Sequence, residues 1–333
     1  MAQVSLKDIA NILGVSSATV SLVLNGKEKE GRVSKELSDK IRKQATLMNY
    51  KPNNLARGLR VGKSQTIGLI VADISNTFFS SLAFHIQEYA ESLGYAVIIA
   101  NTNESDAKME KMINVLRSRQ VDGLIVVPTE NGENAIADIA KSGTPLVLLD
   151  RTFPNLQVNH VMIDNYQASK KALQHLINKG CKRPSLIIYN NTLSHMQERK
   201  RGYVDALQQA GLYDPNLIKE VDYNNLKGDI VDAVDYLLKE EKKVDAIFFA
   251  TNTISMIGLK RMFELNVEVQ QEVQVVCFDK NDVFDFTTQV SIPYITQPIP
   301  EMGHYSVDLL VEQIDKKKSI SGKIELFAEL TCP

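Results

Sequence analysis

The stretch LKDIANILGVSSATVSLVLN, residues 6–25, decides how the N-terminal part of the chain folds. Apolar residues recur in it every three or four positions, which predicts a helix with one apolar face. That face is formed by Leu6, Ile9, Ala10 and Leu13. Gly14 then stands where a sharp turn favours a positive φ. Ser16 or Ser17 can cap a second helix, whose inward face is Val20 and Leu24. This spacing predicts a helix-turn-helix rather than a generic helical hairpin.

A third helix is predicted from Ser34, its N-cap, to about Met48, with Leu37, Ile41, Ala45 and Met48 facing inward. This N-terminal part is basic: residues 1–63 hold 12 Lys and Arg against 5 Asp and Glu, a net charge of +7, whereas the remaining residues carry −9. A basic head on an acidic body indicates that the head meets a polyanion. On charge alone, chance clustering on a solvated face is the alternative.

The outer face of the second helix carries small residues, as a helix in the major groove of double-stranded DNA requires. They are Ser17, Ala18, Thr19, Ser21 and Leu22. Their hydroxyls can bond bases or phosphates, whereas Ala18 and Leu22 offer only apolar contact, as with a thymine methyl. Leu22 is also a candidate for the core of the head.

From Gln65 onward, short apolar runs alternate with amphipathic stretches. The runs cover residues 66–73, 95–101, 122–128, 145–150, 160–164, 184–189, 245–251 and 273–279. Their nearly continuous apolar character is typical of parallel strands buried on both faces. Helices are predicted at 78–93, 105–119, 166–179, 196–210, 227–240 and 298–316. These strands and helices make more β-α units than one open sheet usually contains. The predicted fold is therefore an all-α helix-turn-helix head followed by an α/β body with two lobes, each a doubly wound parallel sheet.

Polar residues follow the predicted strands of both lobes. They are Asp73, Asn76, Asp150, Asp164, Asn252 and Asp279. In open α/β sheets ligands bind beyond the carboxyl ends of the strands, so these residues are expected to face a cleft between the lobes. A single Asp at such a position is more often a helix cap, but its repetition in both lobes favours a binding site.

Several other classes lack support in the sequence. It has no GxGxxG, GxxxxGK[ST], GxSxG or HExxH pattern. Of its five histidines, His195 alone is expected near the cleft, and none clusters with a nucleophile, so neither an enzyme nor a cofactor is predicted. Three widely spaced cysteines indicate neither disulfides nor zinc. We expect a cytoplasmic protein, because no secretory signal or apolar run long enough to cross a membrane is present.

The full chain resembles the LacI/GalR family of bacterial transcription regulators. The resemblance begins with residues 6–26 and 32–79, and continues through IDN (163–165), RKRGY (199–203) and ITQPIPEMG (295–303). It implies a DNA-binding domain at 1–50, a hinge helix or linker at 51–62 and an effector-binding domain at 63–333. That domain would resemble periplasmic binding proteins, with an N-lobe at 63–162 and 294–321 and a C-lobe at 163–293 and 322–333.

The resemblance also implies the DNA contacts. In the hinge, Leu59 would wedge into the minor groove of a palindromic operator, with Ala56 beside it and Asn54 and Arg60 near phosphates. In the head, the expected contacts are Leu6, Ser16, Ser17, Ala18, Thr19, Ser21, Leu22, Asn25 and Ser34. The loop at residues 26–31 is longer than in many relatives, and Leu22 stands where a polar or basic residue is frequent.

For the effector, the resemblance implies contacts from Arg199 and Asp279, which suit the hydroxyls of a sugar or an acidic substituent. The expected set is Asn76, Phe79, Asp150, Asp164, His195, Arg199, Tyr223, Asn252, Asp279 and Gln297. Three residues depart from the family pattern: Cys277 replaces a glycine, Thr77 a proline and Thr253 an aspartate.

The expected function is that of a homodimeric repressor controlled by a sugar or sugar derivative. A nucleobase or a partner phosphoprotein acting as corepressor is the alternative. A periplasmic-type sugar-binding protein would share the body, but not the basic head.

Overall fold

The computed structural model describes residues 4–50, 63–239, 243–280, 291–316 and 322–332. The chain divides into two compact units, Met1–Ser64, here called the head unit, and Gln65–Pro333, here called the body. Among the described residues, no single helix is long and apolar enough to cross a membrane. Only the first two helices of the head pass such a test together, and they are bent by 111°.

The head unit contains three helices, α1 (Leu6–Leu13), α2 (Ser17–Leu24) and α3 (Lys35–Leu47). Each begins at a serine cap whose side chain accepts a backbone N–H: Ser5, Ser16 and Ser34. Gly14 ends α1 with φ 65°, as a sharp turn requires. The buried core consists of Ile9, Ala10, Val20, Val23, Ile41 and Ala45. Val20 and Leu24 were predicted to face inward, and this is confirmed: Val20 is buried and Leu24 packs half-buried against this core. The buried Val23 was not predicted.

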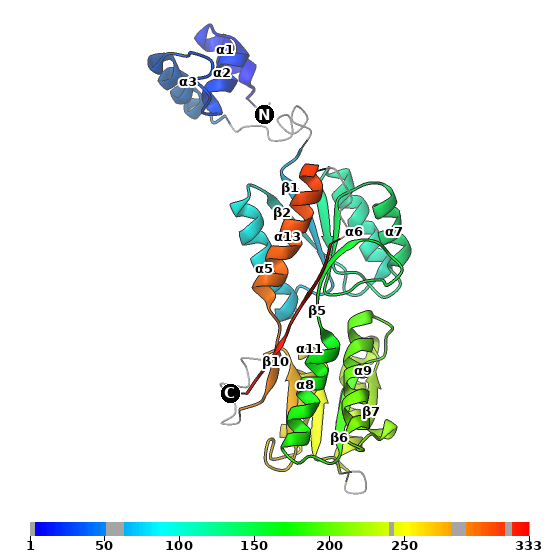
Figure 1. Cartoon of the computed structure of the whole chain (residues 1–333). Helices are drawn as coiled ribbons and strands as arrows, with labels where there is room; N and C mark the ends of the chain where they lie inside the picture. Colours follow the sequence, from blue (N-terminus) through cyan, green and yellow to red (C-terminus); the bar gives the residue numbers. More distant parts are fainter. Residues whose placement is uncertain (1–3, 51–62, 240–242, 281–290, 317–321, 333) are drawn as a thin grey trace. The chain divides into compact units, whose positions relative to one another are not determined.

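The body consists of two lobes (Figure 1). The N-lobe holds a parallel sheet in the order β11-β5-β4-β3-β1-β2. Its strands are β1 (Thr66–Val71), β2 (Ala96–Asn101), β3 (Gly123–Val126), β4 (Leu146–Leu149), β5 (Asn159–Ile163) and β11 (Lys323–Leu326). Its helices are α5 (Thr77–Ser92), α6 (Asp106–Ser118), α7 (Glu133–Lys141) and α13 (Ile299–Lys316). The apolar faces of α5 and α13 pack in one core, and those of α6 and α7 in another.

The C-lobe holds a sheet in the order β12-β10-β9-β8-β6-β7, parallel except for its edge strand β12. Its strands are β6 (Pro184–Tyr189), β7 (Ile218–Val221), β8 (Ala246–Phe249), β9 (Gln274–Phe278), β10 (Tyr294–Thr296) and β12 (Glu329–Thr331). Its helices are α8 (Asn165–Asn178), α9 (Ser194–Gln209), α10 (Leu226–Leu238) and α11 (Asn252–Glu264). Two 3-10 turns, Pro215–Leu217 and Tyr223–Asn225, flank β7. The predicted two-lobed α/β fold is therefore confirmed.

Three segments cross between the lobes, after β5, after β10 and after β11 (Figure 1). Two predicted boundaries are wrong. The sequence places residue 294 in the N-lobe, yet β10 pairs with β9 in the C-lobe. It places residues 322–326 in the C-lobe, yet β11 pairs with β5 in the N-lobe. Both strands are short, and the pattern of a short strand does not specify which sheet supplies its partner.

Candidate effector cavity and DNA-binding surface

A cavity of about 680 Å³ opens between the two lobes of the body. Nine of the ten residues expected from the sequence to contact an effector line it. They are Asn76, Phe79, Asp150, His195, Arg199, Tyr223, Asn252, Asp279 and Gln297. Most of them follow carboxyl ends of strands or begin helices, where parallel sheets present ligand contacts. A cavity of this size and polarity accommodates a small molecule.

Asp164, the tenth residue, is not among the residues lining the cavity. Its carboxylate accepts the backbone N–H of Gln167 at 2.8 Å and so caps α8. The helix-cap interpretation, rather than the ligand contact, therefore describes Asp164.

Asp150 and Asp279 occupy equivalent places in the two lobes. Asp150 follows β4 and Asp279 follows β9, each the third strand in its sheet order. Both have φ 67°, a left-handed conformation that costs free energy outside glycine and that clusters at functional sites. Burial raises the pKa of both carboxyls, to about 6 for Asp279, although Arg199 opposes the rise.

Arg199 and His195 reach the cavity from α9. The Arg199 guanidinium donates from Nε to Asn165 Oδ1 at 2.8 Å and from Nη1 to the Ala250 carbonyl at 2.7 Å. It also stacks on the Phe278 ring, 3.4 Å from the centroid. Burial lowers the pKa of Arg199 to about 10, so the group stays charged at neutral pH. Burial and the two nearby arginines hold the pKa of His195 well below its usual range, so its imidazole is neutral.

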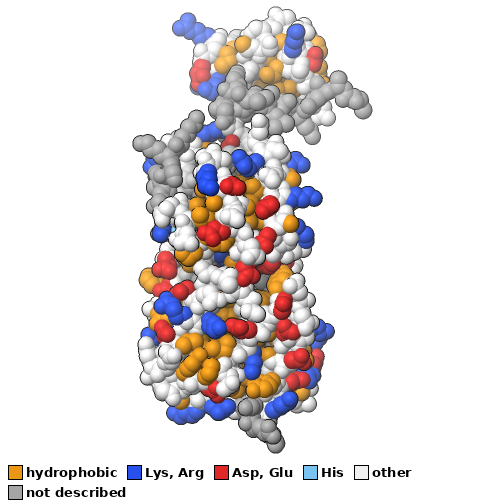
Figure 2. Space-filling model, turned by 90° about the vertical axis from the view of Figure 1, so that its right-hand side faces the viewer, with side chains coloured by type: hydrophobic (Ala, Val, Ile, Leu, Met, Phe, Trp, Pro, Cys, Tyr) orange, Lys and Arg blue, Asp and Glu red, His pale blue; other side chains and the backbone are white. Residues whose placement is uncertain are grey.

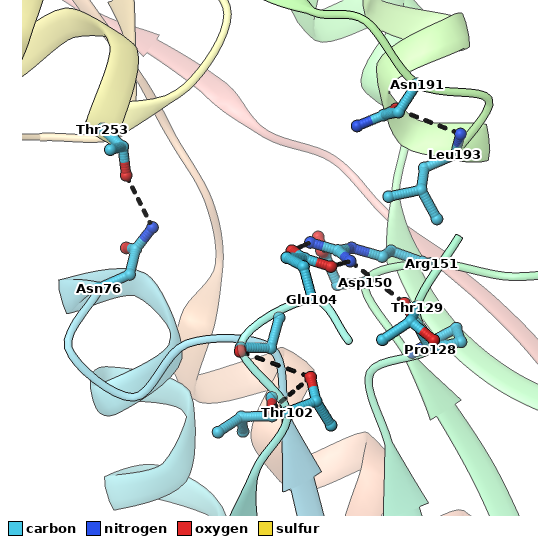
Figure 3. Close-up of polar contacts among 12 residues, drawn as sticks. Asn76, Thr102, Glu104, Pro128, Thr129, Asp150, Arg151, Asn191, Leu193 and Thr253 are labelled. Atoms are coloured by element: carbon cyan, nitrogen blue, oxygen red, sulfur yellow. Dashed lines mark hydrogen bonds and ion pairs between the residues drawn. The ribbon is translucent and has the colours of Figure 1, made fainter. Parts of the chain in front are cut away.

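Arg151 and Glu104 form a pair at the cavity that the sequence interpretation missed. The two guanidinium Nη atoms donate to the two carboxylate oxygens of Glu104, each at 2.7 Å (Figure 3). Arg151 Nη1 also donates to the Pro128 carbonyl at 3.1 Å, and Nε lies 3.4 Å from Asp150 Oδ2. Such a bidentate geometry fixes the guanidinium plane. Burial alone would lower the pKa of Arg151, but Glu104 and Asp150 raise it.

Other lining residues missed from the sequence are Glu130, Tyr189 and Asp222. Glu130 comes shortly after β3, Tyr189 ends β6, and Asp222 directly follows β7. The rule that found Asp150 and Asp279, polar residues at the ends of strands, applied to these positions as well. Asp73, identified by that rule, also lines the cavity.

Hydrogen bonds join the lobes at two edges of the cavity, here called the rim bonds. At one edge, Asn76 Nδ2 donates to Thr253 Oγ1 at 3.3 Å (Figure 3), and Asn252 Nδ2 donates to Thr77 Oγ1 at 3.4 Å. Two of the residues that depart from the family pattern, Thr77 and Thr253, therefore both lie in this edge.

At the other edge, Glu130 Oε1 accepts from the Thr192 backbone N–H at 2.7 Å and from its hydroxyl at 2.9 Å. Beside it, the Thr152 backbone N–H donates to Ser194 Oγ at 3.3 Å.

In the head unit, Ser17 and Ala18 of α2 are exposed, and Thr19, Ser21 and Leu22 are half-buried. Ser16 and Ser34 are exposed caps, Asn25 Nδ2 donates to the Ser21 carbonyl at 2.6 Å, and Leu6 packs against the core of the head. The predicted hinge contacts Asn54, Ala56, Leu59 and Arg60 lie outside the described residues.

Leu22 lies against the long loop after α2. A Cβ atom at Gly31 would lie 2.5 Å from Leu22 Cδ1, so the loop closely approaches this side chain. The two features by which this head departs from the family pattern are thus in contact with each other.

In the part of the chain that the structure describes, no group of three or more His, Cys, Asp or Glu could hold a metal ion.

Comparison with known proteins supports both parts of this description. Residues 5–53 match the model of bacterial regulatory proteins of the lacI family, and residues 64–329 match that of periplasmic binding proteins and sugar binding domain of LacI family. Catabolite control protein A of Priestia megaterium is 30% identical over 97% of this chain and 96% of its own length. The ribose operon repressor of Halalkalibacterium halodurans is 28% identical over 98% of this chain and 95% of its own.

Among solved structures, a Lac repressor dimer bound to operator and the anti-inducer ONPF aligns with a TM-score of 0.85 at 22% identity, covering 99% of this chain and 98% of that one. The complex of the transcriptional regulator CelR with cellobiose aligns with a TM-score of 0.73 at 25% identity, with the same coverage. With a helix-turn-helix head, a two-lobed body and family models that match both, this chain belongs to the LacI family of bacterial regulatory proteins.

Proposed function

We propose that this protein is a transcriptional repressor that binds a palindromic operator as a homodimer, with its operator affinity controlled by a sugar or sugar derivative in the cavity. The observation that carries the proposal is the convergence of nine predicted contact residues from both lobes on one cavity. A ligand that contacts both lobes favours the arrangement of the lobes in which those contacts form, and this is how binding couples to conformation. The proposal assigns no reaction to the cavity.

The DNA-binding part of the proposal is supported by the surface of α2. Its exposed residues are small and polar enough to enter a major groove, and the head region carries the net charge of +7. The hinge, with Leu59 as a minor-groove wedge, remains a proposal based on the family resemblance.

The homodimer is supported by apolar side chains on the N-lobe. Phe84 of α5 is 57% exposed, and Ile74 and Ile99, from the loop before α5 and from β2, are about 40% exposed. The elements α5 and β2 pack together, so these side chains lie on adjoining elements of the N-lobe. Apolar side chains that form a contiguous exposed patch mark an interaction site, and we propose that these three belong to one. A twofold contact through this surface would place two heads on the two halves of a palindrome.

The sugar part is supported by the relatives, whose names include ribose operon repressors and a regulator solved with cellobiose. It is supported also by the cavity, which combines aromatic side chains with carboxylates.

The test is selection of bound duplexes from a random library by the full chain and by residues 65–333. The full chain should enrich a palindromic site and bind it with an affinity that falls steeply as salt rises. The shortened chain should enrich none. Sequence-specific binding by residues 65–333, or an enriched site without twofold symmetry, would contradict the proposal.

A further inference from the structure

Charged side chains line the cavity in unequal numbers. Among the described lining residues, two are arginines, Arg151 and Arg199, and six are acids: Asp73, Glu104, Glu130, Asp150, Asp222 and Asp279. On the face drawn in Figure 2, Lys and Arg alternate with Asp and Glu over both lobes.

Both arginines are bonded to groups of the protein. Arg151 directs two N–H groups at the two oxygens of Glu104 and a further contact at the Pro128 carbonyl. Arg199 donates to Asn165 and to the Ala250 carbonyl, and one face of its guanidinium is covered by the Phe278 ring. An anionic ligand would have to compete with Glu104 for Arg151, because a guanidinium whose charge and planar fork are already matched gains little from a second anion. The two hydrogen-bond partners of Arg199 are neutral, and the negative charges that act on it are those of Asp279 and Asp150.

The carboxylates of the cavity fall into two kinds, those that already accept a backbone N–H and those of a buried pair. Asp73, Glu130 and Asp222 each accept a backbone N–H, at distances of 3.0, 2.7 and 2.7 Å. Asp150 and Asp279 are the buried pair at equivalent ends of β4 and β9.

With Glu104, Arg151 and Arg199, this buried pair forms an inner group of three acids and two bases. The group has a net charge of −1 when all five are ionised.

Two buried polar atoms on side chains that line the cavity have no hydrogen-bond partner in the protein. Gln297 donates from Nε2 to Asp279 Oδ1 at 2.7 Å, which leaves Gln297 Oε1 buried and without a hydrogen bond. His195 Nδ1 is likewise buried and without a partner. Buried polar atoms normally have a hydrogen-bond partner, so these two, on side chains that line the cavity, indicate a missing ligand.

We infer that the effector is an uncharged polyhydroxylated molecule, an unphosphorylated sugar or polyol without a carboxylate, whose hydroxyls donate to Asp150, Asp279 and Gln297. This inference rests on the proposed function, since it takes the cavity as the effector site. Hydroxyls supply donors without charge, and the rings of Phe79 and Tyr223 supply apolar surface for the C–H face of a sugar. A phosphate ester would bring up to about two negative charges beside two carboxylates. A cationic amine would enter the cavity that the guanidinium groups of Arg151 and Arg199 line, and these like charges would repel it.

The experiment is titration calorimetry of the full chain with matched sugars. The probes are pentoses, hexoses and their disaccharides, each hit being compared with its phosphate ester, its uronic acid and its amino sugar. At least one neutral sugar should bind, and its charged counterparts should bind at least 100-fold more weakly. Equal or tighter binding of a phosphorylated, acidic or amino sugar overturns the inference, and so does a panel in which nothing binds.

Operator binding in the presence of the same sugars separates this inference from the proposed function. A neutral sugar that binds without changing operator affinity would leave the ligand class standing and overturn the proposed control. A phosphorylated sugar that binds tightly and releases the operator would overturn the ligand class and leave the proposed control standing.

A pair of variants tests the role assigned to Glu104. Glu104→Gln releases Arg151 from its bidentate partner, so the preference for the neutral sugar over its phosphate ester should fall at least tenfold. The control is Glu272→Gln, which removes the same charge at an exposed residue that does not line the cavity, and should leave the preference unchanged. An unchanged preference in both variants would contradict the idea that Glu104 prevents Arg151 from binding anions.

Discussion

Replacing Asp279 by Asn should stabilise the ligand-free protein while removing its response to effector. Burial raises the pKa of this carboxyl from an ordinary 3.8 to about 6. Because the folded state holds the proton more tightly than the unfolded state, ionisation of Asp279 destabilises the fold as pH rises from about 4 to 6, and the full penalty is present above pH 6. One pKa unit is worth about 1.4 kcal/mol, so that penalty is about 3 kcal/mol.

The neutral amide removes this penalty and keeps an oxygen for Gln297 Nε2. The expected gain in the free energy of unfolding is about 3 kcal/mol at pH 7.5 and about half of that at pH 5, where folded Asp279 is largely protonated already. The favourable attraction of Asp279 to Arg199 is already included, since it lowers the same pKa. At the same time the amide replaces an anionic acceptor of the ligand, so sugar affinity should fall by about 2 kcal/mol or more.

The assay is urea denaturation of wild type and variant at the two pH values without ligand. Asp164→Asn is the control, because Asp and Asn cap helices comparably and Asp164 lies outside the cavity lining. Its stability should change by less than about 0.5 kcal/mol at either pH. A gain in Asp279→Asn that is absent at pH 7.5, or equal at the two pH values, would refute the reasoning from burial of the charge.

Three further predictions concern the operator, the dimer and the rim bonds. Leu59→Ala should weaken binding to operator far more than binding to a scrambled duplex at one salt concentration; an equal loss on both would exclude the wedge. Phe84→Glu should convert the dimer to monomer in sedimentation experiments at micromolar protein, since a charge on an apolar contact is costly; an unchanged dimer would move the interface elsewhere. Thr253→Val removes the acceptor for Asn76 and should weaken sugar binding by about 0.5–1.5 kcal/mol without affecting operator affinity in the absence of sugar; unaltered titrations would show that this bond does not stabilise the ligated form.

The sequence predicted most of the fold because the long elements carry clear periodicity. The strand at 184–189 agrees with β6 at both ends, and the helix expected at 298–316 differs from α13 by one residue. By contrast, α7 with nine residues and the strands β10 and β12 with three residues each were not predicted. Three residues make too little alternation to distinguish a strand from a loop.

The candidate site was predictable to the extent that it lies at strand ends. Asp150 and Asp279 followed from that rule, and Arg199 from the family resemblance. The pairing of Arg151 with Glu104 joins residues 47 positions apart through two loops, and no local pattern encodes that contact. Asp164 also follows a strand, yet it serves as a helix cap. Its strand leads directly into α8, which places this Asp at the helix N-terminus.

Because of the chemistry of the rim bonds, the closing of the cavity and the binding of operator should respond differently to ionic strength. These bonds join amides and hydroxyls to one another, or the Glu130 carboxylate to a neutral N–H and O–H, so salt has little charge–charge attraction to screen between the lobes. Operator binding by a basic head releases counterions and weakens steeply with salt. A rise in ionic strength should therefore loosen the protein from DNA while leaving the opening and closing of its cavity, and the concentration of sugar to which it responds, nearly constant.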